Sequence, residues 1–382
     1  MNTLLIKNGR LFDPASKLDE KADILVKEGI ISAIGSFEHE PGWQTVDASG
    51  CIVTPGLIDM HAHLYPFLPT GIQAESACFA TGVTTAVDAG SSGCGTYPYY
   101  RPFLQYSKLR MKVFIHVSTA GIIEHPIAEN VDPIHFDAKR IGEVLKICGN
   151  EIMGLKIRIS REIVGELGIK PLLRALEIAD EVNLPLMVHP TDPPCTMQEI
   201  VKLLRPGDIL SHAYHNTGHT IIAEDGHVYP EIWHARERGV LFDVANDRRH
   251  FGFSTAKAAI ADGFLPDIIS SDLTSFDAFQ YPTTFSLPML ASKYLALGLS
   301  MEQILPRMTS IPAGIMGIAG ETGALRQGMC ADIAVFKMID KHVLFGDRPA
   351  EDPRCQYQSA EQILKPMMTV REGSIVFRDC EI

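Results

Sequence analysis

Two histidines separated by one residue, His61 and His63, end an apolar run that begins at Val53. Side chains at positions i and i+2 of a strand point to the same face, so a strand ending here would present two imidazoles side by side. Two adjacent imidazoles are half of a metal site. Since so short a pattern also recurs by chance, a pair of hydrogen-bonded histidines is an equal alternative at this point.

Four more polar side chains interrupt apolar runs further along the chain: Lys156, His189, His212 and Asp272. A lone buried histidine is more often a core residue than a ligand, and a lysine inside a strand usually forms a salt bridge. Five side chains of metal-ligating type and one lysine at the ends of such runs instead predict one metal centre, provided that these ends meet. The histidines outside this pattern are expected at the surface, namely His39, His125, His135, His227, His234 and His342.

The elements that would position these residues form a repeating pattern of strand and helix. Helical segments at 171–179 and 196–204 fall between apolar, β-branched runs. Including the run that ends at the histidine pair there are eight, and the other seven are 83–88, 113–117, 152–157, 186–189, 209–212, 240–244 and 268–272. Eight strand–helix units in a row predict an α/β fold, a parallel (β/α)8 TIM barrel, whose active site lies at the carboxyl ends of its strands.

Both ends of the chain differ from this middle part, because they read as short strands broken by turns. Lys7-Asn8-Gly9 and Lys27-Glu28-Gly29 supply the positive-φ residues that hairpins need. The two ends are therefore predicted to form one small β-sandwich domain from residues 1–54 and 323–382. The barrel domain is predicted to span residues 55–322.

The composition of the 382-residue chain, with 46% hydrophobic and 21% charged residues, is that of a globular protein. Its net charge of -12 argues against nucleic acid or an anionic membrane as a partner. The eight cysteines include no C-x-x-C pair, so neither a disulfide framework nor a zinc knuckle is expected. Without a signal-peptide pattern or an 18-residue apolar run, we expect a cytoplasmic protein with a small-molecule substrate. Apolar residues on the predicted outer helices would permit a homo-oligomer.

As a set, these motifs resemble the amidohydrolase superfamily, specifically its binuclear branch with a carbamylated lysine. The matching residues are Pro55-Gly56-Leu57-Ile58-Asp59 before the histidine pair, Gly154-Leu155-Lys156, His189, His212 and Asp272. Within the superfamily, segments 88–93, 154–160 and 211–214 are most similar to bacterial dihydroorotase-like deacetylases. Dihydroorotases carry an arginine two residues after the second histidine, where this chain has Tyr65. The resemblance therefore favours hydrolysis of an open-chain acyl group over ring opening.

The resemblance also implies a role for each residue. Carbon dioxide would convert Lys156 into a carbamate that bridges two divalent ions, for which zinc matches the ligand types well. The more buried ion would be held by His61, His63, Lys156 and Asp272, and the second by His189, His212 and the other carbamate oxygen. A hydroxide between the ions would attack an acyl carbon, because metal coordination lowers the pKa of water to about 7, and Asp272 would act as general base and then acid.

Substrate contacts are predicted at the same rim. Arg158 follows Lys156 by two residues on the same face and could grip a carboxylate, with an ion pair to an acidic rim residue as the alternative. Tyr65, His116 and Asn246 are further candidates. We expect a hydrolase that removes an acyl group, typically acetyl, from an amide or ester of a small carboxylate-bearing substrate. The alternatives are a cyclic-amide hydrolase of dihydroorotase or hydantoinase type, a nucleobase deaminase, and a metal-binding module without catalysis.

Overall fold

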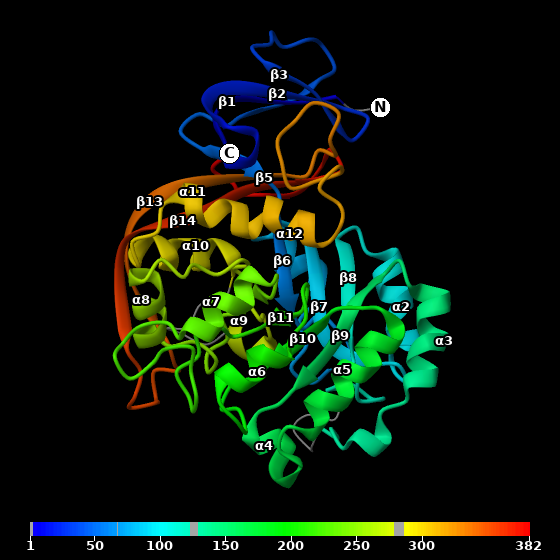
Figure 1. The fold of residues 1–382 in the computed structure, drawn as a ribbon. Coiled ribbons are helices and arrows are strands. Elements are labelled where there is room, and N and C mark those ends of the chain that lie inside the picture. Colours follow the sequence, from blue (N-terminus) through cyan, green and yellow to red (C-terminus); the bar gives the residue numbers. More distant parts are fainter. Residues whose placement is uncertain (1–2, 67, 123–128, 279–285) are drawn as a thin grey trace.

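The computed structural model describes residues 3–66, 68–122, 129–278 and 286–382, and it consists of an upper sheet and a barrel below it (Figure 1). Both termini lie in the upper sheet. His125 falls outside the described residues, whereas the other five histidines expected at the surface are exposed, as predicted. No helix within the described ranges is long and apolar enough to cross a membrane.

The upper sheet joins the two ends of the chain. Its strand order is β15-β14-β13-β5-β1-β2-β3, with β4 paired to β1. The strands are β1 (Leu4–Asp13), β2 (Leu18–Lys27), β3 (Ile30–Gly35), β4 (Gln44–Asp47), β5 (Ile52–Pro55), β13 (Ile333–Gly346), β14 (Tyr357–Arg371) and β15 (Ser374–Arg378). The antiparallel pairing of β5 with β13 connects the amino-terminal and carboxy-terminal parts. A hydrophobic cluster of its own, which includes Ile6, Val53 and Ile333, lies on this sheet.

The two predicted turns of this sheet have different outcomes. Glu28 (φ 53°) and Gly29 (φ 81°) form the turn between β2 and β3, as predicted. Asn8 also has a positive φ of 63°, but the chain does not turn there, and the register between β1 and β2 shifts instead. The hairpin predicted at Lys7-Asn8-Gly9 is therefore wrong, because a β-bulge uses the same backbone conformation as a hairpin turn. Gly9 also permits close packing there, since a Cβ atom would lie 2.4 Å from Val53 Cγ2.

The barrel contains seven parallel strands in chain order. They are β6 (Leu57–Ala62), β7 (Val83–Gly93), β8 (Arg110–His116), β9 (Ile152–Arg158), β10 (Leu186–His189), β11 (Ile209–Leu210) and β12 (Leu241–Phe242). The eighth predicted run is not a regular strand, yet it forms parallel bridges from Ile268 to Asp243 and from Leu273 to Ala62. It thus lies between β12 and β6 and closes the ring. The predicted TIM-barrel fold class is confirmed.

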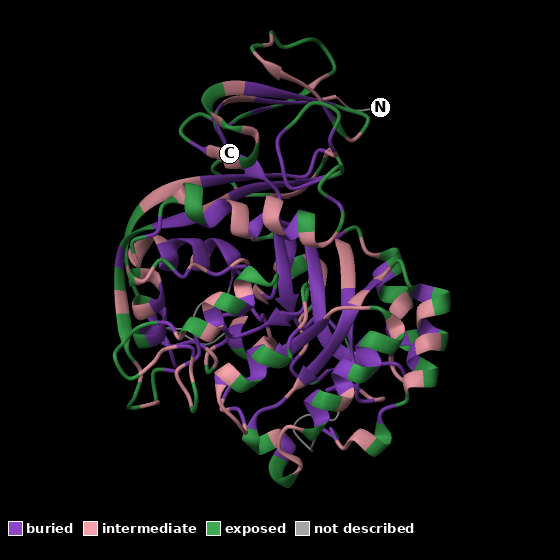
Figure 2. Cartoon of the chain, viewed as in Figure 1, coloured by how far each residue is buried: buried purple, intermediate pink, exposed green. Residues whose placement is uncertain are grey.

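Helices surround the barrel, and their buried faces point towards the strands (Figure 2). They are α1 (Ala74–Phe79), α2 (Tyr97–Tyr106), α3 (Ala138–Cys148), α4 (Arg161–Val164), α5 (Lys170–Val182), α6 (Met197–Leu203), α7 (Pro230–Glu237), α8 (Phe253–Ala261), α9 (Ser275–Ala278), α10 (Leu287–Ala296), α11 (Met301–Ile304) and α12 (Ser310–Ile315). The predicted helices at 171–179 and 196–204 correspond to α5 and α6. Thr196 and Glu199 form a capping box that fixes the start of α6.

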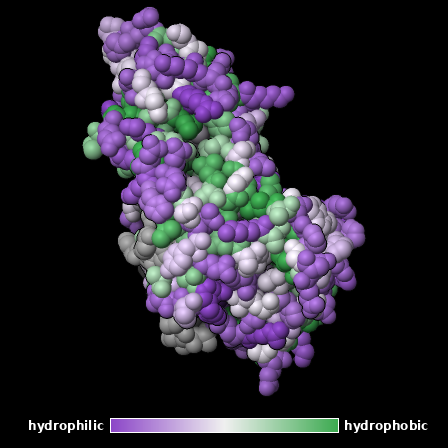
Figure 3. All heavy atoms as spheres, turned by 90° about the vertical axis from the view of Figure 1, so that its left-hand side faces the viewer, coloured by the Kyte–Doolittle hydropathy of each residue, from purple (hydrophilic) through white to green (hydrophobic). Residues whose placement is uncertain are grey.

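The long β13–β14 hairpin connects the upper sheet to the mouth of the barrel. Along its course the Leu364 amide donates a hydrogen bond to Ser292 Oγ in α10 (2.9 Å). At its tip Arg348 Nη2 donates to Asn216 Oδ1 (2.6 Å) and Asp347 Oδ2 accepts from the Phe253 amide (3.2 Å). The side of the molecule that includes this hairpin is largely hydrophilic, with apolar residues gathered near its middle (Figure 3). Because the hairpin contacts both parts, the division at residues 54 and 323 remains a prediction.

Candidate metal centre

All six residues predicted as metal ligands lie at one end of the barrel, buried in its mouth. His61 belongs to β6, Lys156 to β9, and His189 is the last residue of β10. Of the other three, His63 follows β6 directly, His212 lies two residues after β11, and Asp272 is the last residue of the closing run 268–272. Residue exposures range from 0% to 9%. Parallel strands carry their carboxyl ends to the same rim, which is why residues so far apart in the sequence meet here.

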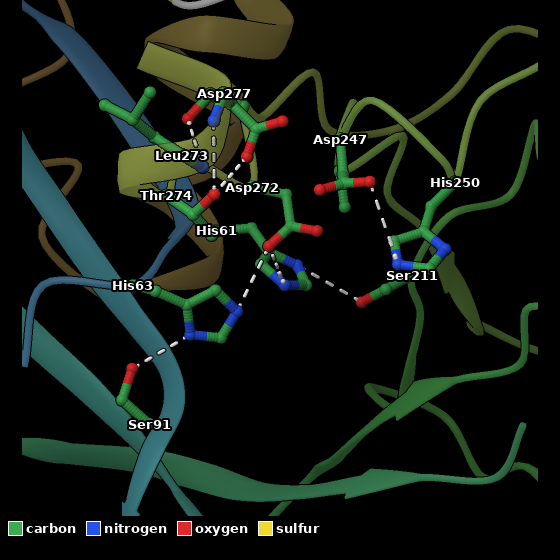
Figure 4. A network of polar contacts seen from close by, with 12 residues as sticks. His61, His63, Ser91, Ser211, Asp247, His250, Asp272, Leu273, Thr274 and Asp277 are labelled. Atoms are coloured by element: carbon green, nitrogen blue, oxygen red, sulfur yellow. Dashed lines mark hydrogen bonds and ion pairs between the residues drawn. The ribbon is translucent and has the colours of Figure 1, made fainter. Parts of the chain in front are cut away.

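The carboxylate of Asp272 is at the centre of this group (Figure 4). Asp272 Oδ1 lies 3.1 Å from His63 Nε2 and 3.4 Å from His61 Nε2, and Oδ2 lies 3.8 Å from His212 Nε2. Lys156 Nζ lies 3.3 Å from His61 Nε2. The ring centroids of His189 and His212 are 4.1 Å apart. The structure thus brings the six residues together, while their role as ligands stays a prediction.

Hydrogen bonds at Nδ1 orient three of the imidazoles. His61 Nδ1 lies 3.0 Å from Asp243 Oδ2, and His63 Nδ1 lies 2.9 Å from Ser91 Oγ. His212 Nδ1 donates to the carbonyl oxygen of Ala245 at 2.8 Å, which leaves a lone pair on Nε2 of the neutral ring. Contacts of this kind fix the tautomer and direction of metal-ligating histidines. In each case Nε2 is the nitrogen that faces Asp272.

Buried atoms without partners indicate that this group fits a divalent cation. Nε2 of His189 and Nε2 of His212 are buried and have no hydrogen-bond partner among the described residues. Buried polar atoms in folded proteins normally have such partners. His61, His212 and Asp272 also each offer one ligand atom within 4.8 Å of the others. Imidazole nitrogens and carboxylate oxygens are the ligands that zinc binds in proteins.

The histidines are neutral at ordinary pH. Burial lowers the pKa of His63 to about 4, and it also lowers those of His61, His189 and His212 well below their usual value. A neutral imidazole is the form that binds a metal, so these rings need not lose a proton first.

Lys156 and Asp272 are shifted towards their uncharged forms as well. Burial lowers the pKa of the Lys156 amine to about 8. Burial, with a smaller effect from neighbouring Asp247, raises the pKa of Asp272 well above its ordinary value. Perturbed groups of this kind concentrate at functional sites. The lysine therefore has a substantial fraction of free amine near pH 8.

Three residues near the centre, each in a different segment, have left-handed backbone although none is glycine. The φ angles are 52° at His212, 42° at Ala245 and 52° at Asp272. Non-glycine residues adopt this conformation only at a cost of about 1–3 kcal/mol, and such positions cluster at functional sites. At His212 and Asp272 this backbone conformation sets the starting direction of a side chain that reaches the centre.

Arg158 has a partner that the sequence did not identify. Its Nη1 lies 3.0 Å from Glu129 Oε2, and Glu129 Oε1 lies 2.7 Å from His116 Nε2. The Glu129 side chain is 1% exposed. Of the two interpretations of Arg158, the ion pair with an acidic rim residue is thus present in the structure. Arg158 and His116 also line the central cavity, so a substrate contact for them remains a prediction.

Tyr65 and Asn246 do not line the central cavity. The Tyr65 hydroxyl donates to the carbonyl oxygen of Thr96 at 3.4 Å, and its ring packs edge-on against Tyr100. Asn246 Oδ1 accepts a hydrogen bond from Lys293 Nζ at 3.1 Å. For both residues, a contact with substrate stays a prediction.

Four residues that were not predicted from the sequence also shape the site. Asp243, which contacts His61, interrupts the predicted apolar run 240–244 and could have been found by the rule that found the ligands. Burial raises the pKa of Asp243 to about 7. Asp247 and His250 line the cavity but lie in an irregular segment, and Glu129 follows the residues that are not described. For these three, no strand end marks the position.

The central cavity is small and continues into a wider groove. It has a volume of about 160 Å³, and its wall includes His63, Lys156, Arg158, His189 and Asp272. A groove of about 660 Å³ shares Glu162, Arg249 and His250 with it and is bordered on the other side by residues 348–354 of the β13–β14 hairpin. A separate apolar cavity of about 440 Å³ beside α1 and α2 contains none of the six predicted ligands.

Known proteins are similar to this chain in sequence, and solved structures are similar to it in fold. A deacetylase of Brucella anthropi is 30% identical over 92% of this chain and 87% of its own length. A solved structure described as an adenine deaminase covers 98% of this chain and 99% of its own, with a TM-score of 0.87 and 25% identity. A dihydroorotase structure has the same coverage and TM-score at 26% identity.

These similarities confirm the predicted resemblance to deacetylases and dihydroorotases. The sequence model of the amidohydrolase family matches residues 52–376, which include the barrel and most of the carboxy-terminal strands. The chain belongs to the amidohydrolase family and is a hydrolase.

Proposed function

We propose that the protein is a metal-dependent hydrolase that removes a small acyl group, typically acetyl, from an amide or ester whose other half carries a carboxylate. The observation that carries this proposal is the convergence of His61, His63, Lys156, His189, His212 and Asp272 at one end of the barrel, where four of them line a small cavity. The similarity to a deacetylase over most of both chains supports the same class of reaction.

The size of the two connected spaces supports a small acyl group. The cavity at the centre, about 160 Å³, suits a group the size of acetyl. The groove beyond it, about 660 Å³, has room for a larger leaving half. A substrate that spans both would place its acyl carbon beside Asp272 and its leaving group towards Arg249.

Two divalent ions, with zinc as the best match to the donors, would be held by the six residues. His61, His63, Lys156 and Asp272 would bind the inner ion, and His189, His212 and Lys156 the outer one. Bound ions of this kind lower the pKa of water and polarise a carbonyl oxygen. Lys156 would bridge them after its free amine forms an N–C bond to carbon dioxide and loses a proton. The lowered pKa of Lys156, about 8, favours that reaction.

Asp272 is placed to move the proton. Its carboxylate would accept a proton from the attacking water as the new C–O bond forms. It would then donate that proton to the leaving nitrogen or oxygen as the acyl bond breaks. The raised pKa of Asp272 fits a group that must hold the proton briefly.

Of the three arginines that line the cavity, Arg248 lies over the ring of Phe276, which leaves two for the substrate carboxylate. Arg158 lines the cavity but already has an ion pair with buried Glu129. Arg249 lines both the cavity and the groove, and it has no ion-pair partner among the described residues. We therefore propose Arg249 as the primary contact for the carboxylate, with Arg158 beside the acyl group.

A substrate panel tests this function. Zinc-loaded protein prepared with bicarbonate would be assayed on N-acetyl amino acids, O-acetyl 2-hydroxy acids, and the same compounds with the carboxylate converted to a carboxamide. We expect turnover of open-chain acetyl compounds and a higher kcat/KM for the acids than for the carboxamides. Opening of cyclic amides without turnover of any open-chain compound would overturn the proposal.

Cyclic-amide hydrolysis is the second candidate, because a dihydroorotase structure matches the whole chain. Tyr65 stands where dihydroorotases carry a substrate-binding arginine, which counts against it. Dihydroorotate and hydantoins belong in the panel for this reason. The similarity to a structure described as an adenine deaminase places adenine there too, although Lys156 at the centre favours a two-ion hydrolase.

A further inference from the structure

The segment between β12 and α8 brings two residues to the centre that are not among the six predicted ligands, Asp247 and His250. Both line the central cavity. Asp247 is 9% exposed, and the His250 side chain is 20% exposed. One ligand atom each of Asp247, His250 and Asp272 lies within 4.8 Å of the other two. A carboxylate and an imidazole are therefore added on the outer side of Asp272.

The ring of His250 completes a group of three imidazoles. Its centroid lies 4.5 Å from that of His189 and 4.7 Å from that of His212, which are themselves 4.1 Å apart. The planes are inclined to one another by 51° to 80°, so the rings are not stacked. Zinc binds imidazole nitrogens at about 2.0–2.1 Å, so a single ion between these rings would need one nitrogen of each ring to face it.

Neither ring nitrogen of His250 is engaged in a hydrogen bond within the described part of the chain. Nδ1 is buried without a partner. Nε2 lies 3.8 Å from Asp247 Oδ1, which is longer than a hydrogen bond. In Figure 4, Asp247 and His250 lie on the opposite side of Asp272 from His63. The edge of the ring that carries Nε2 faces Asp247.

The two carboxylates beside His250 also favour the binding of a cation. Asp247 and Asp272 place two carboxylates side by side, and the adjacent His189, His212 and His250 contribute lone pairs. Closely spaced buried carboxylates are unfavourable unless a positive group lies between them.

We propose that His250 is a third imidazole ligand of the ion held by His189 and His212, with Asp247 supplying negative charge beside it. This inference rests on the proposed function only in requiring that a second ion binds. It assigns a ligand that the family resemblance does not supply, from a segment with no regular secondary structure. It also predicts that the outer ion binds more tightly than two histidines and the bridging lysine alone would allow.

Metal binding tests this assignment independently of activity. The full-length protein would be dialysed against graded free zinc and analysed for bound metal by mass spectrometry, and the cobalt-loaded form by absorption spectroscopy. Wild type should bind two ions. His250→Gln should keep the inner ion and bind the second at least about tenfold more weakly, with an altered cobalt spectrum, as losing a supporting partner alone typically costs 10- to 100-fold.

The matched control is His215→Gln. His215 is also a buried histidine without side-chain partners among the described residues, but it does not belong to the group around Asp247. The His215→Gln variant should bind both ions with the affinities of the wild type. If His250→Gln does not fold, Asp247→Asn is measured instead and should also weaken the second ion.

Two results would contradict different parts of the argument. Unchanged affinity for both ions in His250→Gln, or in Asp247→Asn where that variant replaces it, would overturn the assignment of His250. A wild-type protein that binds fewer than two ions would instead overturn the two-ion function, before any variant is compared.

Discussion

The two halves of the barrel hold their metal-facing residues in different ways. In the first half, β6 to β10 are regular strands of 4 to 11 residues. His61, Lys156 and His189 lie within these strands, so the pleat of the sheet sets the direction of each side chain. Lys156 is paired with His116 of β8 and Met187 of β10, and His189 is paired with Arg158 of β9, so the sheet itself fixes these two residues.

In the second half, β11 and β12 have two residues each and the closing run has no regular strand. Here His212 and Asp272 are directed by left-handed backbone, and Ala245 has the same conformation. Side-chain contacts, such as that between Lys293 and Asn246, replace the ladder of a sheet. One half of the centre therefore follows from strand geometry, whereas the other half depends on particular side chains.

The largest effect should come from the carboxylate in the irregular half. Asp272→Asn removes the group that moves the proton, so kcat should fall by about 10²–10⁴-fold. Steady-state kinetics with the metal content of each sample determined would measure it. Asp277→Asn, a buried aspartate of α9 that does not line the cavity, is the control. Activity of Asp272→Asn within tenfold of wild type would contradict the assignment.

In the regular half, Lys156→Ala should remove the bridge between the ions. We expect loss of bound metal and a fall in activity of about 100-fold or more, since weakening even the support of a ligand costs 10- to 100-fold. Acetate or propionate in excess should partly restore both, because a carboxylate can replace the carbamate. Metal analysis with and without the acid measures this. An alanine variant with full metal content and activity would exclude a bridging role.

A smaller effect should appear at Lys293, which supports the irregular half. Lys293 is fully buried above the ring of Phe251, and burial lowers its pKa to about 7. In the unfolded chain the value is about 10.4, so between pH 7 and 10 the unfolded state binds more protons. The contribution of Lys293 to the free energy of unfolding therefore rises with pH across this window, by about 3 kcal/mol.

Urea unfolding of metal-free protein at pH 7, 8.5 and 10 would test this. Lys293→Met should reduce the rise by about 3 kcal/mol relative to wild type and keep only the part due to buried Lys156, whereas Lys257→Met, at an exposed lysine of α8, should leave the rise unchanged. Parallel pH profiles of the Lys293→Met variant and wild type would show that this lysine is not a buried neutral amine.

The smallest expected effect is a change in stability when an alanine is replaced by glycine in each half of the barrel. Ala245→Gly removes the strain of a left-handed alanine, and we expect an unchanged or higher melting temperature, with a gain of up to about 1 kcal/mol. Ala86→Gly, inside strand β7, should lower stability by about 0.5–1 kcal/mol. Thermal unfolding of both variants measures the contrast. Equal destabilisation by the two substitutions would remove the distinction between the halves.

The regular half is the part that the sequence predicts best. A polar residue that ends an apolar, β-branched run is visible without any structure, and His61, Lys156 and His189 were found by that rule. The same rule located His212 and Asp272, although the strands around them are short or absent. Apolar pattern alone does not distinguish a strand from an extended segment that makes only two bridges.

The features of the site that could not be predicted from the sequence depend on contacts between distant segments. Glu129 beside Arg158, and Lys293 beside Asn246, are pairs that no local pattern connects. Asp247 and His250 lie in a segment without periodicity, so nothing in it indicates which side chains face inwards. The bulge at Asn8 was mistaken for a turn because both need the same positive φ.

The β13–β14 hairpin has a consequence for how the chain reaches its native state. β13 pairs with β5, near the start of the chain, and the tip of the hairpin borders the groove beside the metal centre. The mouth of the barrel is therefore incomplete until the last tenth or so of the chain has been synthesised and docked. Contacts between segments so distant in sequence form slowly. A ribosome-bound chain that stops before β13 would carry all six predicted ligands but lack one wall of the groove.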